Sequence, residues 1–265
     1  MSSCSRNLDL NCRRLQKDRH PKMPEMTVID ALLEQVIDVP VRDVIIGLYD
    51  VLVESCDVGL ASTMLRPRDG KFITIRNFGK LTEMRTAELA EYLRSDNLLE
   101  AAIGMATVNS SLPRPPSDSF VEINARELLI ERGKDKVVGI IGHFPFVDAL
   151  RMTARKVLVF EKIPREGDLS ESDIPSYLPE ADVVGLTATS IINHSFEEVM
   201  RHIKPTAFVV MLGPSTPLSH VLFDFGIHAL AGTLASDVEK LKREVKEAVP
   251  FKFLKSVRRV IWFKP

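Results

Sequence analysis

The sequence predicts an α/β protein in which a small α+β domain precedes a doubly wound parallel sheet. Three observations support this fold class. Short β-rich segments separated by turn residues lie between residues 41 and 75, and short apolar runs alternate with helical segments beyond residue 136. A segment rich in serine and proline separates these two patterns. The 265 residues are enough for two compact domains.

Composition excludes several classes of protein. With 45% hydrophobic and 27% charged residues, the chain can form a sizeable core, which argues against global disorder. The longest apolar run, Ala207–Leu212, is far shorter than the roughly 18 residues of a membrane-spanning helix. No apolar signal segment follows Met1. The cysteines Cys4, Cys12 and Cys56 form no Cys-x-x-Cys pair, so we expect a cytoplasmic protein without a disulfide framework.

Charge is distributed unevenly along the chain. The net charge is −1, but residues 1–22 carry six basic and two acidic residues, a net of +4 that leaves −5 for the rest. Residues 1–25 are therefore expected to form a tail, either a disordered leader or a basic arm for an anionic surface. The acidic remainder argues against nucleic acid as a partner. We expect neither nucleic acid nor membrane as a partner, and a homodimer is the base-rate expectation.

Residues 26–116 are predicted to form the α+β domain. A helix is expected to begin after Thr27, which can cap it together with Asp30, and to end before Pro40. An antiparallel meander should follow, because the β-rich pieces are short and separated by turn residues. Its strands are expected at Val44–Leu48, Val51–Ser55, Val58–Ser62 and Phe72–Ile75, with turns at Tyr49–Asp50, Cys56–Asp57 and Pro67–Gly70.

Two helices are expected to complete this domain. The first begins near Thr86 and runs to Leu93. The second spans about Leu98 to Val108 and is apolar or small on nearly every side, which is typical of a helix buried between layers. The following segment, residues 110–119, contains three prolines and four serines. It marks the predicted domain boundary.

Residues 117–265 are predicted to form the doubly wound sheet. Asn124 and Glu127 can cap a first helix that ends near Gly133. The strands are apolar runs without alternation, as expected for strands buried on both faces. They are expected at Val137–Ile141, Val157–Phe160, Val183–Leu186, Ala207–Leu212 and Ile227–Ala231. Helices are expected at Phe146–Thr153, Ile174–Leu178, Phe196–Ile203, Pro217–Phe225 and Asp237–Ala248, the last with a capping box of Ser236 and Glu239.

Polar residues and glycines follow these strands at the edge where open α/β sheets bind ligands. Glycine, hydroxyl, amide, imidazole and carboxylate groups all converge there. The residues that we expect to bind a ligand are His143, Glu161, Thr187, Thr189, Asn193, Gly213, Ser215 and Gly232.

The first two of these residues each allow two interpretations. The segment Gly142–Pro145 has one glycine in place of a Gly-x-Gly-x-x-Gly loop, which disfavours NAD and FAD. His143 suits a general acid/base or a metal ligand, and equally a hydrogen bond at a strand end. Glu161 lies 19 residues beyond the glycine, a spacing that suits the ribose of an adenosyl cofactor such as S-adenosylmethionine. A salt bridge to Lys162 or Arg165 is the alternative for this carboxylate.

The remaining polar residues precede two of the predicted helices. Thr187, Thr189 and Asn193 come before one helix, and Gly213 and Ser215 before the next. Exposed helix N-termini attract carboxylate or phosphate groups. Capping of the helices does not account for all of these residues together, so an anionic ligand is expected.

Two further patterns are less specific. His143, Glu161, His194 and Cys56 are candidate ligands of a divalent metal, but no spacing such as His-x-x-x-His supports a preformed site. The segment Phe251–Lys264 interleaves five bases with aromatic residues. Such a segment can stack on RNA, but it is more typical of a final edge strand with basic side chains reaching solvent.

Five segments, in order along the chain, carry a family resemblance. They are Lys136–Gly142, Val159–Glu161, Ala181–Thr189, Met211–Pro217 and Gly226–Gly232. Over roughly residues 27–250 the chain resembles the "putative heavy-metal chelation" family, a domain of unknown function. The resemblance implies an enolase-N-terminal-like domain followed by a Rossmann-like domain, with a site between them that Asn109 would approach. His194 and Ser195 after Asn193 depart from the family pattern of small residues and a threonine.

These observations predict a pocket between the two domains that binds a small anionic or metal-chelating metabolite, with a role in heavy-metal chelation. Two alternatives stay open. One is a transferase that uses an S-adenosylmethionine-type cofactor, and the other is a non-enzymatic ligand-sensing or scaffold protein. The residues fix neither a reaction nor a catalytic group.

Overall fold

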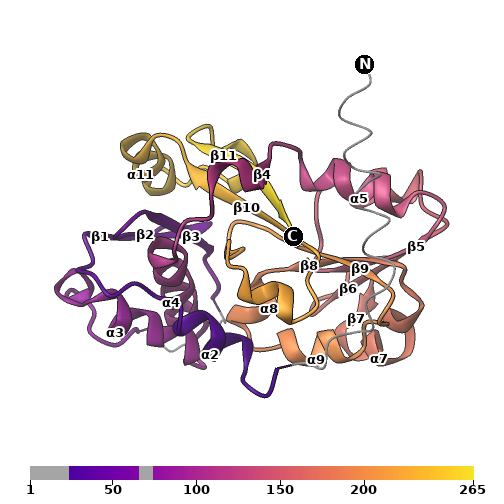
Figure 1. Cartoon of the computed structure of the whole chain (residues 1–265), viewed down its shortest axis with the longest axis horizontal. Coiled ribbons are helices and arrows are strands. Elements are labelled where there is room, and N and C mark those ends of the chain that lie inside the picture. Colours follow the sequence, from indigo (N-terminus) through magenta and orange to yellow (C-terminus); the bar gives the residue numbers. More distant parts are fainter. Residues whose placement is uncertain (1–23, 66–73) are drawn as a thin grey trace.

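The computed structural model of the chain describes residues 24–65 and 74–265. The expectations for residues 1–23 and for the turn at Pro67–Gly70 lie outside the described residues, as does the first half of the strand expected at Phe72–Ile75. The described part contains a three-stranded sheet and an eight-stranded sheet. Figure 1 shows the small sheet with α2 to α4 at one end of the molecule and the large sheet toward the other.

The small sheet is antiparallel as predicted, but Thr74 and Ile75, the described half of the expected fourth strand, lie in no strand. Its strands are β1 (Asp43–Ile46), β2 (Asp50–Glu54) and β3 (Val58–Ser62), paired in that order. β3 has the predicted bounds, but β2 begins at Asp50, so the prediction of a turn at this residue was wrong. An aspartate is typical of an exposed turn, but Asp50 is buried and forms the first residue of an otherwise apolar strand.

The helices of this part are α2 (Val28–Leu33), α3 (Thr86–Ala90) and α4 (Leu98–Ser111). Thr27 and Asp30 form the predicted capping box, although α2 ends well before Pro40. α4 is buried along its whole length except at Asn109. It extends through Ser111 into the predicted boundary segment. Gly59 of β3 permits close packing on α4, because a Cβ there would lie 2.0 Å from the carbonyl oxygen of Ala106.

The large sheet is mixed rather than wholly parallel. Its strands are β4 (Phe120–Val121), β5 (Val137–Ile141), β6 (Lys156–Glu161), β7 (Leu169–Ser170), β8 (Val183–Thr187), β9 (Phe208–Leu212), β10 (Ala229–Ala235) and β11 (Val257–Phe263). Their spatial order is β4-β11-β10-β9-β8-β5-β6-β7, and the strands from β10 to β7 are parallel. β11 is antiparallel to β10, and it is not the predicted edge strand because β4 pairs with its end.

Helices cover both faces of the parallel strands. They are α5 (Ala125–Gly133), α6 (Val147–Arg151), α7 (Ile174–Tyr177), α8 (Thr189–Ile192), α9 (Phe196–Arg201) and α10 (Val221–Asp224), followed by α11 (Val238–Lys246). Val138 and Ile140 of β5 belong to the hydrophobic cluster that includes α5 and α6. Val137 and Ile141 belong to the cluster on the other face, with α7 and α9. Both faces of β5 are therefore apolar, which explains its lack of alternation.

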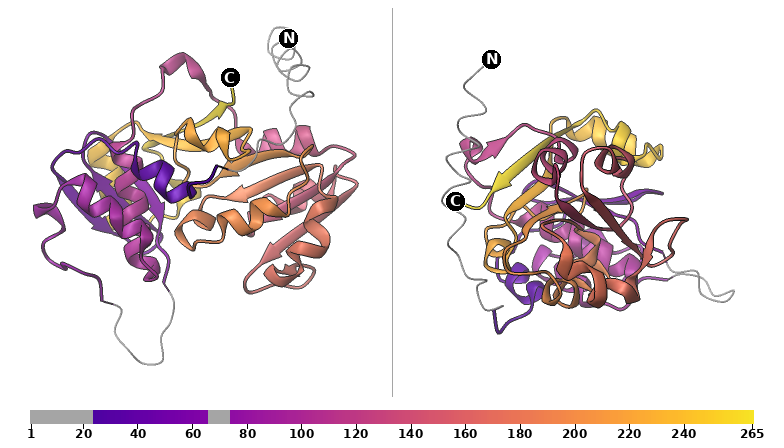
Figure 2. Two further views of the ribbon diagram at one scale, coloured as in Figure 1. Left: turned by 60° about the horizontal axis from the view of Figure 1, so that its bottom comes forward. Right: turned by 90° about the vertical axis from the view of Figure 1, so that its right-hand side faces the viewer.

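α11 joins the end of the chain to the small sheet. It is capped by Asp237 rather than by the predicted Ser236. Leu241 of this helix forms a hydrophobic cluster with Leu52 of β2, on the sheet face away from α4. Lys242 lies 3.2 Å from the carboxylate of Asp43 and also pairs with Glu54. The left view of Figure 2 shows the small sheet (indigo to magenta) at one end of the molecule. No helix within the two described ranges is long and apolar enough to span a bilayer.

Candidate functional site

A cleft of about 810 Å³ lies between the small sheet and the large sheet. The ends of β2 and β3 contribute one wall, and the loop after β5, the start of α5 and strands β9 to β11 contribute the others. The lining residues that matter for ligand binding are Asp50, Ser62, Arg126, Phe144, Phe146, Gly213, Gly232, Lys252, Arg259 and Ile261. Ligand sites often occur in clefts between structural units, as this one is.

Basic side chains and an apolar floor give this cleft its chemistry. Phe144 and Phe146 stack with ring centroids 5.4 Å apart and form part of the floor. Arg259 is held in place because its Nη2 atom donates to the carbonyl oxygen of Phe251 at 2.9 Å. Arg126 has no ion-pair partner within the described part of the chain. Arg126, Lys252 and Arg259 can therefore neutralise an anionic group of a ligand.

Two of the predicted glycines line this cleft. Gly213 follows β9 with φ of +116°, a backbone conformation that residues with a Cβ rarely adopt. At Gly232 in β10, a Cβ would lie 3.0 Å from a methyl carbon of Leu218. Gly213 is needed for the sharp turn out of β9, and Gly232 for close packing of the β9–α10 loop.

The most unusual group in the cleft is Asp50, which sequence analysis missed. This residue is 3% exposed, and its Oδ2 atom has no hydrogen-bond partner among the described residues. Burial raises the pKa of its carboxyl to about 7. A perturbed titratable group in a cleft is a recognised sign of a functional site. The sequence held one sign of this buried acid, because Asp50 directly precedes three consecutive apolar residues of a strand.

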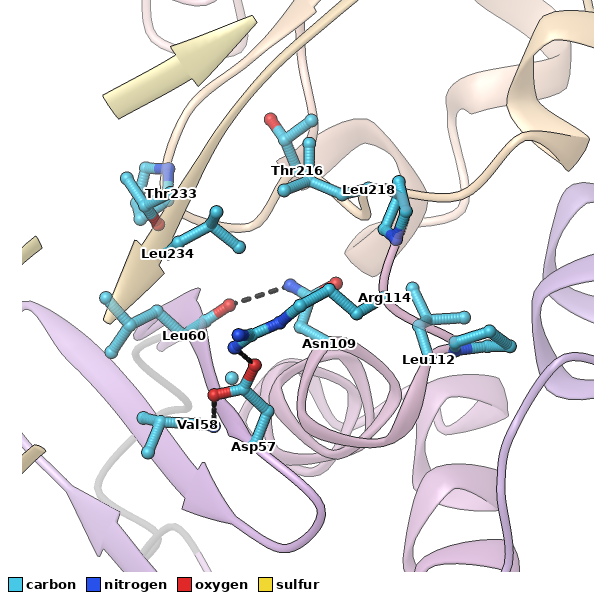
Figure 3. Close-up of a pocket in the computed structure, with 14 residues that line it drawn as sticks. Asp57, Val58, Leu60, Asn109, Leu112, Arg114, Thr216, Leu218, Thr233 and Leu234 are labelled. Carbon is cyan, nitrogen blue, oxygen red and sulfur yellow. Dashed lines mark hydrogen bonds and ion pairs between the residues drawn. The ribbon is translucent and has the colours of Figure 1, made fainter. Parts of the chain in front are cut away.

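A second, smaller cavity of about 40 Å³ lies between β3, α4 and the loop after β9 (Figure 3). The Asn109 side chain points across it and donates to the carbonyl oxygens of Leu60 at 2.8 Å and Ser215 at 3.2 Å. Ser215 in turn accepts a hydrogen bond from the Ser62 backbone at 2.8 Å. The predicted residues Asn109 and Ser215 thus connect the two sheets. The cavity has room for water-sized occupants only.

His143 and Glu161 meet at a third place, beside the β5 end. The backbone N–H of His143 donates to the Glu161 carboxylate at 2.6 Å. The His143 Nδ1 atom lies 3.1 Å from Asp168, whose side chain is fully buried. His143 and Arg165 line a pocket of about 220 Å³. The other carboxylate contact of Glu161 is the backbone of Lys162 at 3.3 Å, so this carboxylate bonds to main-chain groups.

The remaining predicted residues mostly bond to one another or to their neighbours. The hydroxyls of Thr187 and Thr189 are 2.8 Å apart. The Asn193 side chain accepts from the backbone of Ser195 at 3.1 Å. His194 reaches the carbonyl oxygen of Leu93 at 2.9 Å. The structure thus distributes the predicted set over several places, and Gly213 and Gly232 are the members that line the large cleft.

A resident heavy metal requires several converging donor side chains. Residues 24–65 and 74–265 contain no group of three or more His, Cys, Asp or Glu side chains that could hold a metal ion. Cys56 is exposed, and Cys4 and Cys12 lie outside the described residues. The donor set of the described part therefore does not fit a resident heavy metal.

Solved structures establish the fold independently. A protein of unknown function from Desulfitobacterium hafniense superposes with a TM-score of 0.79 at 24% identity, covering 89% of this chain and 98% of that one. A protein of unknown function from Pyrococcus horikoshii gives a TM-score of 0.69 at 22% identity, with 88% and 96% covered. At these identities the likeness shows the fold alone.

Sequence comparisons identify the family. An uncharacterised protein of Methanocaldococcus jannaschii is 28% identical over 152 residues, which cover 55% of this chain. The chain spans 59% of the length of that relative. Two family models, both described as "Putative heavy-metal chelation", match residues 29–112 and residues 124–263. Because the second match alone spans more than half of the sequence, the chain belongs to the putative heavy-metal chelation family DUF364.

Proposed function

We propose that this protein binds a small anionic metabolite in the cleft between its two sheets. The observation that carries the proposal is the placement of Arg126, Lys252 and Arg259 around an apolar floor. Ligand sites combine such apolar walls with a few well-placed polar groups. The volume of about 810 Å³ suits a small metabolite.

A role in heavy-metal chelation would then depend on the metabolite rather than on protein ligands. The described part of the chain lacks a group of converging donors for a metal. An anionic metabolite with several oxygen or nitrogen atoms can itself hold a divalent ion. We therefore propose that any metal reaches the protein already bound to the metabolite.

The strand order supports a finer assignment of the fold. The parallel strands run β7-β6-β5-β8-β9-β10, so the order reverses between β5 and β8. This is the order of the doubly wound Rossmann fold. We propose that the large sheet is Rossmann-like and that the small sheet with its helices is enolase-N-terminal-like.

Calorimetry with chosen probes tests the proposed function. Succinate, citrate, Zn²⁺, zinc citrate and S-adenosylmethionine would each be titrated into the purified protein. We expect the carboxylates to bind, with or without zinc, and Zn²⁺ alone to bind weakly. Tight binding of Zn²⁺ alone would contradict the proposal, and binding of S-adenosylmethionine in place of the acids would favour the transferase alternative.

A pair of variants locates the binding. Arg126→Gln removes a positive charge from the cleft and should weaken carboxylate binding about tenfold, because a hydrogen bond to a charged group contributes roughly 1.5 kcal/mol. Lys246→Gln removes a charge from an exposed residue of α11 outside the cleft lining. It should leave the affinity within about twofold. Equal losses in both variants would show only a general charge effect.

A further inference from the structure

We propose that the metabolite bound in this cleft carries an amino group as well as its anionic group, and that Asp50 binds the amino group. The ligand class is thus an aminocarboxylate. This inference rests on the proposed function, because it assumes that the cleft is the ligand site.

The first argument is that Asp50 lacks a partner within the protein. Asp50 is 3% exposed, yet its buried Oδ2 atom accepts no hydrogen bond from any described residue. Buried polar groups in native proteins are almost always paired, so each exception calls for an explanation. A ligand that supplies the missing donor explains this one.

The second argument is that neighbouring cations do not pair with Asp50. Lys242 of α11, the helix packed on this face of the small sheet, is already paired with Asp43 and Glu54. The other titratable groups that line the cleft are Tyr49, Arg126, Lys252 and Arg259. None of the three basic residues forms an ion pair with Asp50 within the described part of the chain. No cation of the described part therefore neutralises this acid.

The third argument concerns where the two kinds of charge lie. Asp50 belongs to the small sheet, whereas Arg126 lies in the first turn of α5 and Arg259 lies on β11 of the large sheet. Apolar side chains such as Phe144 and Ile261 line the space that they share. A ligand with a cationic group, a short aliphatic part and an anionic group would match these three surfaces in turn. Amine and carboxylate groups together are also donors that hold divalent metals.

The pH dependence of binding follows from the same contact. Burial raises the pKa of Asp50 to about 7, so the empty cleft holds a largely neutral carboxyl below that pH. An ammonium group requires the ionised form. Binding of an aminocarboxylate should therefore strengthen as the pH rises from 6 to 8 and should lower the pKa of Asp50. A carboxylate without an amino group should show no such increase.

Matched probes test the proposal. Linear ω-amino acids of three to six carbons would be titrated by calorimetry at pH 6, 7 and 8, each beside the fatty acid of equal length. We expect at least one amino acid to bind tenfold or more tightly than its matched fatty acid at pH 8. Equal binding of each pair would overturn this inference and leave the proposed function standing. Failure of all probes to bind would count against both.

Two variants make the test specific to Asp50. Asp50→Asn should abolish the preference for amino acids and the pH dependence, while fatty-acid binding persists. Asp96→Asn removes a negative charge from an exposed residue outside the cleft lining and should retain the preference. Thermal melting would confirm that both variants are folded. A preference that survives in Asp50→Asn would overturn the inference.

Discussion

Asp168 and Asp50 are both buried aspartates, and they differ in what surrounds them. Asp168 contacts His143 Nδ1 at 3.1 Å, accepts from the Arg165 backbone at 3.3 Å and lies 3.8 Å from Arg151. Asp168 Oδ1 and Asp50 Oδ2 both lack a hydrogen-bond partner among the described residues, but Asp50 also lacks an ion pair there. The first carboxylate joins two loops, and the second faces a cleft. Ion pairing, and not burial, therefore distinguishes the acid that joins two loops from the acid that lines the cleft.

The largest effect should come from Asp50→Asn, which tests whether this acid costs stability. The pKa is about 3.9 in the unfolded chain and about 7 in the folded protein. Folding therefore favours the protonated form, and stability is lost as the pH rises from about 4 to about 7. The difference between these two pKa values lowers the free energy of unfolding of the wild type by about 4 kcal/mol above pH 7. Asparagine at this position avoids that loss, but its own unpaired amide group offsets part of the gain.

Urea unfolding at pH 4 and pH 8 measures this effect. We expect Asp50→Asn to be more stable than the wild type by about 2 kcal/mol at pH 8 and less stable by about 2 kcal/mol at pH 4, where the carboxyl of the folded wild type is already neutral. A variant that is less stable at pH 8 would mean that Asp50 has a stabilising partner. The contrast with Asp168 would then disappear.

Asp168→Ala should have the opposite sign. It removes the acceptor of His143 and Arg165 and leaves a small cavity, so we expect a loss of about 2 kcal/mol in the free energy of unfolding. Asp148→Ala is the control, because the Asp148 side chain is 93% exposed and should contribute under about 0.5 kcal/mol. Equal unfolding midpoints for Asp168→Ala and the wild type would refute a structural role.

The smallest effect is expected from Glu161→Gln. The glutamine keeps an acceptor for the His143 backbone but loses the charge, so stability should fall by about 1 kcal/mol or less. Carboxylate affinity in the cleft should stay within about twofold, because Glu161 bonds to the main chain and lies outside the cleft lining. A tenfold loss of affinity would make Glu161 a ligand-binding residue, as the sequence predicted.

Much of the fold followed from local patterns in the sequence. The strand Val58–Ser62 and the capping box of Thr27 and Asp30 were predicted correctly, because turn residues and caps act over a few residues. The buried helix α4 was predicted because it is apolar on all sides. β4 and β7 have two residues each and carry no period that could reveal them. The apolar run of β11 also gives no indication that this strand is antiparallel to β10.

The site was less predictable than the fold for a physical reason. Polar residues after strands looked alike in sequence, whether they cap a helix, join two loops or line a cleft. Asn109 and Ser215 hydrogen-bond across the two sheets, a contact 106 residues apart that no local pattern encodes. Asp50 looked like a turn residue beside Tyr49, and only the tertiary structure shows that it is buried.

The position of α11 limits how ligands can enter and leave. This helix follows the last parallel strand of the large sheet and packs on the small sheet, on the face away from α4. Leu241 and Val245 make the apolar contacts, and Lys242 forms the ion pairs. Swinging the two sheets apart would bring Leu52 and these leucine and valine side chains into water, at a cost of roughly 1.5–3 kcal/mol each. Exchange of the proposed ligand should therefore depend on side-chain rotations at the mouth of the cleft rather than on hinge motion.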